Sequence, residues 1–188
     1  MSAVEPSGRE PAPGALAAVQ AFVNTNDIEG RNDKLATPDL AHVWLKEQGL
    51  LSPSESVSEV DFLRLLGVRE ALRALALANN GLPLDKAAVE VLNDAATRTL
   101  TIQFTLRGWM LRPAGTGVER VIGHGLATVL DAMREGSWLR LKACRRDVCR
   151  RLYYDRSRNG SSSWCSMATC GNRAKTSAYR RRRKETPA

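Results

Sequence analysis

The sequence has no apolar run that could span a membrane and too few cysteines for a disulfide scaffold. Its 188 residues include four Cys and two His, whereas a membrane helix needs roughly 18 or more consecutive apolar residues. The first 14 residues hold three prolines, two glutamates and one arginine, so they lack the basic and apolar regions of a secretory signal. We therefore expect a cytoplasmic protein with no membrane partner, whose reduced thiols bind metal or have no special role.

The sequence also lacks the residue patterns on which enzymes depend. It has no glycine-rich phosphate loop and no serine in a nucleophile elbow. His42 lies beside an apolar stripe and His124 among polar residues of an expected helix, so packing and solvation explain them better than catalysis. An enzyme acting on a small molecule would need a pocket with a base, and nothing stands at catalytic spacing from either histidine. We expect no enzymatic activity.

Acidic residues are scarce only in the last quarter of the chain. Residues 1–140 carry 14 Lys and Arg against 17 Asp and Glu, whereas residues 141–188 carry 14 against 3. All four cysteines lie in this second, basic segment. A near-neutral body with a small basic tail indicates a two-part protein, and the charge of the tail indicates a polyanionic partner.

The first part has the pattern of a mostly helical domain. Residues 1–14, rich in Pro, Gly and Glu, are expected to form a disordered tail. Residues 57–78 predict a long helix with Phe62 and Leu72 inward, and residues 118–133 predict another with a strong apolar face. Between them, strict alternation over residues 99–106 predicts a half-buried strand, and residues 109–112 its antiparallel partner in a small hairpin.

Two shorter stretches are also informative. Thr37 followed by Pro38 predicts a helix start, with Leu40, Val43 and Trp44 on one apolar face, and Gly49 predicts the end of this helix. Residues 15–23 are helix or strand by periodicity alone.

Polar residues gather at positions 24–33, directly after an apolar stretch. A loop is the favoured interpretation, because turn residues collect between elements. The alternative is the rim of a pocket for a small-molecule effector, formed by Asn24, Thr25 and Arg31.

The four cysteines form two matched pairs. Four residues separate Cys144 from Cys149 and Cys165 from Cys170, and fifteen residues lie between the pairs. Two pairs on short turns supply the four thiolates that close a tetrahedron on Zn²⁺. Nearby lysines and arginines offset the charge of four thiolates and lower the thiol pKa values. Free core cysteines or cytosolic disulfides fit this paired, basic context less well.

The predicted zinc is structural, and there is one ion. Four protein sulfurs leave no open position for a water ligand. The segment from residue 141 onward has few apolar residues of its own, so the metal must supply its folding energy. Removal of the metal should then unfold the tail and spare the body.

A basic helix is expected to follow the last cysteine. Asn172 serves as its cap, and Arg173, Arg180 and Arg183 share one face. A zinc-anchored helix with an arginine stripe suits the DNA major groove. The alternative is a solvated terminal charge run. The predicted fold class is α+β, a mostly helical N-terminal domain with a small antiparallel hairpin followed by a small four-cysteine zinc-finger domain that ends in a basic helix.

The string from Cys144 to Lys175, with the last cysteine and the three residues after it reading Cys170-Gly171-Asn172-Arg173, resembles the CGNR zinc finger. The resemblance covers about residues 138–184, leaving a tail at residues 185–188, and it assigns the zinc ligands to the four cysteines. Members usually carry an N-terminal ABATE domain, whose opening is similar to Phe22-Val23-Asn24-Thr25, so residues 15–137 are expected to be an ABATE-like regulatory domain. The family is regarded as bacterial transcriptional regulators, often described as stress-induced.

The expected function is therefore that of a zinc-dependent regulator. Its finger would bind double-stranded DNA, and its N-terminal domain would sense a small-molecule effector or form a homodimer. The sequence departs from the family at Ser161–Ser163, where members commonly have arginines, which removes basic contacts from the finger loop. The residues expected to contact nucleic acid are Arg145, Arg146, Arg150, Arg156, Arg158, Arg173, Lys175, Arg180, Arg181, Arg183 and Lys184.

An RNA- or ribosome-binding zinc protein without DNA sequence specificity is the alternative function. Tyr153, Tyr154, Trp164 and Tyr179 are interleaved with arginines and could stack on bases. Against it, Tyr154 and Trp164 lie close in sequence to the zinc ligands, where packing is the more common role.

Overall fold

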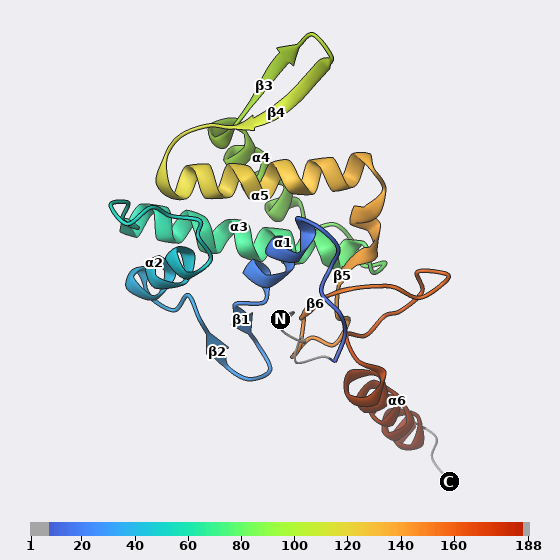
Figure 1. The fold of residues 1–188 in the computed structure, drawn as a ribbon. Coiled ribbons are helices and arrows are strands. Elements are labelled where there is room, and N and C mark those ends of the chain that lie inside the picture. Colours follow the sequence, from blue (N-terminus) through green and yellow to red (C-terminus); the bar gives the residue numbers. More distant parts are fainter. Residues whose placement is uncertain (1–7, 186–188) are drawn as a thin grey trace.

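The computed structural model describes residues 8–185, with side chains described through Arg180 except Ala178. It confirms the predicted fold class, a helical N-terminal region with small hairpins followed by a four-cysteine region that ends in a helix (Figure 1). The elements are α1 Leu16–Val23, β1 Asn26–Asp27, β2 Asn32–Asp33, α2 Pro38–Glu47, α3 Glu59–Ala78, α4 Lys86–Thr99, β3 Leu100–Thr105, β4 Gly108–Pro113, α5 Gly117–Arg134, η1 Ser137–Arg140, β5 Leu141–Ala143, β6 Leu152–Tyr154, η2 Met167–Gly171 and α6 Asn172–Glu185.

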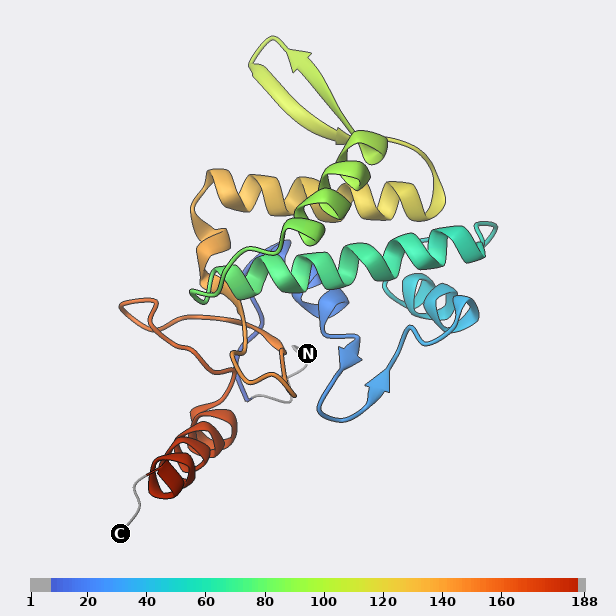
Figure 2. The ribbon, with the colours of Figure 1, turned by 180° about the vertical axis from the view of Figure 1, so that it is seen from behind.

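Helices α1, α3 and α5 form the centre of the molecule. The apolar faces predicted for α3 and α5 are buried there, with Leu65 and Leu72 of α3 against Leu126 of α5. Helix α4 packs against α3 and α5 on the side that faces the viewer in Figure 2. Residues 15–23, ambiguous by periodicity, form α1, and they bury Val19 and Val23 in the same core.

Local signals place the ends of α2 correctly, but of the three residues on its predicted apolar face only Trp44 packs against the core. The Thr37 hydroxyl oxygen accepts from Leu40 N at 3.2 Å, so Thr37 caps the helix. Gly49, with φ +68°, follows its end. Leu40 and Val43 are about half exposed, whereas Ala41 and Leu45 are buried. Helix α2 lies at the edge of the bundle against α3, so only a narrow stripe of its surface is covered.

The hairpin β3–β4 forms where the alternation predicts it, but it is not half-buried. Its register pairs Ile102 with Leu111 and Phe104 with Trp109. Phe104 is 83% exposed, because the hairpin projects away from the helices (Figure 1). Its base packs where Pro113 meets Gly123 of α5, and nearer its tip the Arg134 guanidinium lies 5.5 Å from the centre of the Trp109 ring. Alternation indicates one apolar face; it says nothing about what covers that face.

The end of the predicted disordered tail has defined contacts. Ala12 is buried, and its N–H donates to Gln20 Oε1 at 2.7 Å. Arg9 reaches the cysteine region, where its Nε donates to Cys165 O at 2.8 Å. Residues 8–14 therefore differ from the expectation of disorder, because long-range partners compensate for their composition. Residues 1–7 lie outside the described residues.

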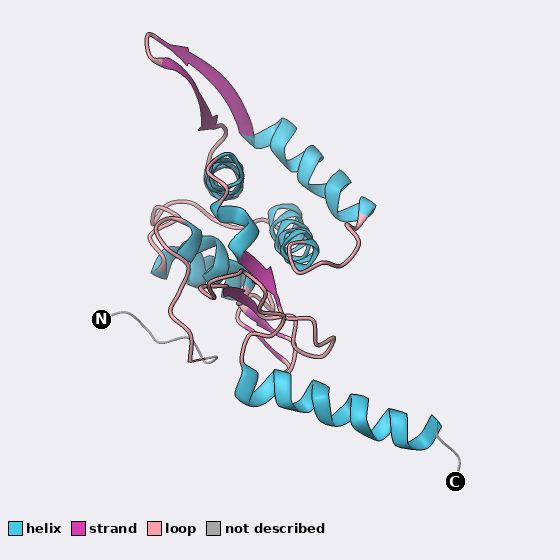
Figure 3. Cartoon of the chain, turned by 90° about the vertical axis from the view of Figure 1, so that its right-hand side faces the viewer, coloured by secondary structure: helices cyan, strands magenta, loops and turns pink. Residues whose placement is uncertain are grey.

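The C-terminal region shares its core with the helices. Strands β5 and β6 pair antiparallel, with Leu141 opposite Tyr154. Trp138, Leu141 and Leu152 are buried in the same apolar cluster as the helices. Helix α6, by contrast, extends away from the rest, at the opposite end of the molecule from the β3–β4 hairpin (Figure 3). One part of the basic region is thus built into the body and another projects from it.

Candidate zinc centre and nucleic-acid interface

The two cysteine pairs meet in space. Cys144 and Cys149 bracket the turn between β5 and β6, where Cys149 N donates to Arg146 O at 2.9 Å. Cys165 precedes η2, and Cys170 lies within it. All four Sγ atoms lie within 4.8 Å of one another. The local structure explains why four residues separate the cysteines of each pair. The first pair spans the turn between two strands, and the second pair spans a turn of helix.

The sulfur geometry fits Zn²⁺. Sγ of Cys165 lies 3.6 Å from Sγ of both Cys149 and Cys170. A tetrahedron with Zn–S bonds of about 2.3 Å has edges of about 3.8 Å. The four side chains are buried, with Trp164 packed against them. The predicted cofactor, a structural zinc held by Cys144, Cys149, Cys165 and Cys170, is confirmed by this cluster.

The thiols favour a bound cation. Hydrogen bonding lowers the pKa of Cys144 to about 3, chiefly through Cys149 and then Cys165. The neighbouring Cys144 and Cys149 sulfurs, and then burial, raise the pKa of Cys165 above its usual range. The first thiolate therefore opposes ionisation of the next. A divalent cation removes this opposition, which is what permits four thiolates in one buried site.

Side chains pack closely against the backbone directly after the second pair. A Cβ on Gly171 would lie 2.4 Å from the Met167 sulfur and 3.2 Å from Trp164. Asn172 is not the predicted cap. Its backbone is helical (φ −65°), and its Nδ2 donates to Ala168 O at 3.2 Å. The π-helical turn η2 runs directly into α6, so no free helix end exists there to be capped.

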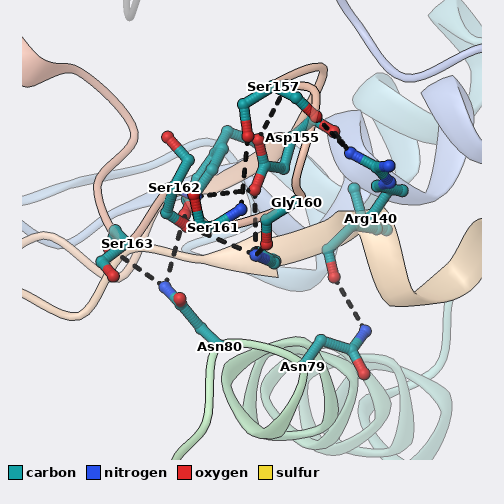
Figure 4. Close-up of polar contacts among 12 residues, drawn as sticks. Asn79, Asn80, Arg140, Asp155, Ser157, Gly160, Ser161, Ser162 and Ser163 are labelled. Carbon is teal, nitrogen blue, oxygen red and sulfur yellow. Dashed lines mark hydrogen bonds and ion pairs between the residues drawn. The ribbon is translucent and has the colours of Figure 1, made fainter.

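A buried ion pair organises the loop between the cysteine pairs (Figure 4). Lys142 Nζ lies 2.9 Å from Oδ2 of Asp155, which is fully buried. Asp155 also accepts from the backbone N–H groups of Ser157 (3.0 Å) and Ser162 (2.9 Å). Burial acts to raise the Asp155 pKa, but the bonds from Ser157, Lys142 and Ser162 outweigh it and lower the pKa to about 2. Asp155 is thus a carboxylate that folds the loop.

Two asparagines at the end of α3 hold the C-terminal region against the bundle. Asn79 Nδ2 donates to Trp138 O and Leu141 O, both at 2.9 Å. Asn80 Nδ2 donates to Ala143 O at 2.8 Å and to Ser163 O at 3.0 Å (Figure 4). The chain around Ser161–Ser163 is therefore fixed by its backbone, whatever its side chains are.

Two of the predicted nucleic-acid contacts converge on one carboxylate. Glu29, in the turn between β1 and β2, accepts from Arg146 Nη1 at 2.8 Å and also pairs with Arg173. The bond from Arg146 is the largest cause of a lowered Glu29 pKa. Arg173 remains 60% exposed. The turn from Cys144 to Cys149 is called the zinc turn below. A shallow groove of about 490 Å³ lies between this turn and α6. It is lined by Arg146, Ala168, Thr169, Asn172, Arg173, Thr176, Ser177 and Arg180.

Three other predicted contacts are engaged within the protein. Arg145 donates from Nε to Asn80 O at 2.7 Å, Arg150 pairs with Asp147, and Arg156 pairs with Glu10 at 3.3 Å.

The remaining predicted contacts are exposed or undescribed. Arg158, Lys175 and Arg180 are exposed. The side chains of Arg181, Arg183 and Lys184 lie outside the described residues, although the α6 backbone continues through them.

The residues of the predicted effector pocket either bond other parts of the protein or are exposed. Asn24 exchanges two hydrogen bonds with the backbone of Leu152, at 2.8 and 3.0 Å. Thr25 is buried and accepts from Arg69 at 3.2 Å. Arg31 is exposed in the β1–β2 turn. Asn24 and Thr25 thus bind the fold together, and the described cavity with the most apolar wall lies elsewhere, beside α5.

Sequence reasoning missed the residues that join the two regions. Glu29, Asn80 and Arg9 belong to no motif and no apolar stripe. Their partners are backbone oxygens and arginines distant in the chain, so no spacing rule could have paired them. The one signal in the sequence was charge, because Glu29 is acidic and could pair with arginines of the strongly basic tail.

No helix within residues 8–185 is both long and apolar enough to cross a membrane. The CGNR zinc finger family matches residues 140–183. The ABATE family, described as "Putative stress-induced transcription regulator", matches residues 16–134, more than half of the chain. No curated protein matches the sequence. The chain therefore belongs to the ABATE family, which is described as stress-induced transcription regulators, and it carries a CGNR zinc finger after its ABATE domain.

Proposed function

We propose that this protein is a cytoplasmic, zinc-dependent regulator whose finger binds double-stranded DNA. The observation that carries the proposal is the groove between the zinc turn and α6. Arg146, Arg173 and Arg180 all line it. Guanidinium groups bind phosphate oxygens well, and phosphate contacts set the position of a protein on DNA. The projecting α6 then extends the contact surface beyond the groove.

The aromatic residues favour DNA over the RNA alternative. Base stacking on single-stranded RNA needs exposed rings. Tyr153 is fully buried, Tyr154 is partly buried against the core, and Trp164 packs against the zinc cysteines. Tyr179, 56% exposed, is left as the described candidate on α6. A basic groove with little stacking surface is better suited to a duplex.

The N-terminal domain is proposed to regulate the finger. It holds the finger through Asn79, Asn80 and Glu29, so a change in the bundle has a direct path to the basic groove. A regulatory and non-enzymatic role agrees with the description of the family. A homodimer is proposed on general grounds, because one small module gives modest specificity.

Salt titration of duplex binding tests the proposal. If about five to eight phosphates are contacted, log K falls with log[salt] at a slope of roughly −5 to −7. Arg173→Ala should lower affinity by about 1–3 kcal/mol if Arg173 reads a base, and equally on all sequences if it contacts phosphate. Arg107→Ala, at the tip of the distant β3–β4 hairpin, is the matched control. Equal effects of both variants would refute the groove as the binding site.

A further inference from the structure

A small apolar cavity lies within the N-terminal bundle. Its volume is about 130 Å³, and its walls come from α1, α3, α5 and Leu50. Apart from His124 and Thr128, every lining residue is apolar.

Small residues keep this cavity open. Glycine weakens a helix interior, so each glycine there needs a reason. Gly123 has one, because a Cβ would lie 2.4 Å from Thr99 O. Gly125, two residues later in α5, has no atom within 4 Å of the corresponding Cβ position. Packing therefore does not require Gly125; with Ala15 and Ala18 it leaves the space beside α5 unfilled.

The polar groups lie at one side of the cavity. His124 is exposed, and the Thr128 hydroxyl already donates to His124 O at 2.9 Å. The rest of the wall offers no side-chain hydrogen bond. A polar molecule would lose its hydration there without compensation, whereas an apolar ring with one polar substituent could keep that substituent next to His124 and solvent.

We propose that this cavity binds a single-ring aromatic molecule carrying one polar substituent. An engineered cavity of about 150 Å³ lined by Leu, Ile and Phe stays dry and binds benzene, so this volume is of the size that accepts one ring. Longer acyl chains exceed it. The ring contacts Phe22, Leu72 and Leu126, and the substituent faces His124.

Helix α1 links the cavity to the finger. Val19 and Phe22 line the cavity, while Gln20 and the adjoining Asn24 bond the backbone of Leu152 in β6, Gln20 at 3.5 Å and Asn24 at 3.0 Å. A ligand that fixes α1 therefore acts on β6, the strand that follows the zinc turn. This consequence rests on the proposed DNA-binding function, whereas ligand binding itself does not.

Calorimetric titration of the intact, zinc-loaded protein tests the proposal, with p-cresol and toluene as probes. We expect saturable one-to-one binding of both, and a higher melting temperature in their presence. Ala18→Phe and Gly125→Leu, which place a side chain in the cavity from opposite walls, should weaken binding at least tenfold. Ala21→Phe, on an exposed position of α1 outside the lining, should leave it unchanged.

The mouth of the cavity has its own test. His124→Ala should weaken p-cresol binding by about two- to tenfold, the value of one hydrogen bond, and leave toluene binding unchanged. Failure of both probes to bind the folded wild type, or equal binding to wild type and both cavity variants, would overturn the proposal. Duplex binding measured on the same variants separates the two ideas, because loss of ligand binding with DNA binding intact leaves the proposed function standing.

Discussion

The helical bundle and the finger are held together by different forces. The bundle buries apolar faces of three helices, with Leu65, Leu72 and Leu126 at its centre. The finger buries four sulfurs, one ion pair and a set of hydrogen bonds to backbone oxygens. Hydrophobic burial tolerates small shifts, since it depends on area rather than direction. Metal and ion-pair bonding does not tolerate such shifts. The structure of the finger should therefore be more sensitive than that of the bundle to a small displacement of its bonded groups.

The two regions are nevertheless not independent. Leu141 and Leu152 of strands β5 and β6 lie in the core of the bundle, and Asn80 bonds the backbone just before each cysteine pair, at Ala143 and Ser163. The part of the finger that depends on zinc alone is therefore smaller than the whole basic segment that begins at residue 141. It comprises the zinc turn, η2 and α6, while β5 and β6 have apolar packing of their own.

Loss of a zinc ligand should have the largest effect. Cys165→Ser should abolish stoichiometric zinc and unfold η2 and α6, because structural zinc contributes roughly 10–16 kcal/mol of apparent binding free energy in small fingers. The bundle should keep its helical signal. Metal analysis and circular dichroism measure both, with Ser166→Ala as the neighbouring control. Zinc retained in full by Cys165→Ser would contradict the four-cysteine site.

Breaking the buried ion pair should come next. Asp155→Asn leaves the Lys142 charge buried without its partner, and such a loss costs on the order of 3 kcal/mol. Urea unfolding of the zinc-loaded protein measures it. Asp131→Asn, an exposed ion-pair partner of Arg134 on α5, should change stability by less than about 1 kcal/mol. Equal losses in the two variants would show that Asp155 does not organise the loop.

Glu29 tests whether the bundle restrains the finger. If the finger binds DNA as proposed, phosphate must compete with this carboxylate for Arg146 and Arg173. Glu29→Gln should therefore raise duplex affinity by about two- to fivefold on all sequences, the value of an exposed ion pair. Glu90→Gln, an exposed position on the distant α4, provides the control. Unchanged or weaker binding by Glu29→Gln would argue against competition.

The smallest effect is an acid dependence within the bundle. Backbone N–H groups of Ser52 and Gly117, with Arg120, lower the Glu55 pKa to about 2. A depressed folded pKa gives stability that is full above about pH 4.5 and is lost as pH falls toward 2. The difference in melting temperature between wild type and Glu55→Gln should shrink over that range, in chelator-free buffer. A constant difference would rule out the ionised carboxylate as its source.

Patterns within one element were readable from the sequence, and contacts between elements were not. Thr37 and Gly49 identified the ends of α2, and the cysteine spacing identified the zinc ligands. Periodicity did not predict burial: Phe104 lies on the apolar face of the hairpin and is nevertheless 83% exposed. The Glu29 pairs depend on the path of the whole chain, and so no local signal could give them.

Zinc-dependent recognition of DNA is the central claim, and selection from a random duplex pool tests it most directly. The intact protein would be incubated at near-physiological salt, with and without a zinc chelator, and the bound fragments sequenced. We predict a reproducible motif that disappears with the chelator, its symmetry reporting whether a dimer binds. Binding that survives chelation, or no enrichment in either condition, would contradict the account.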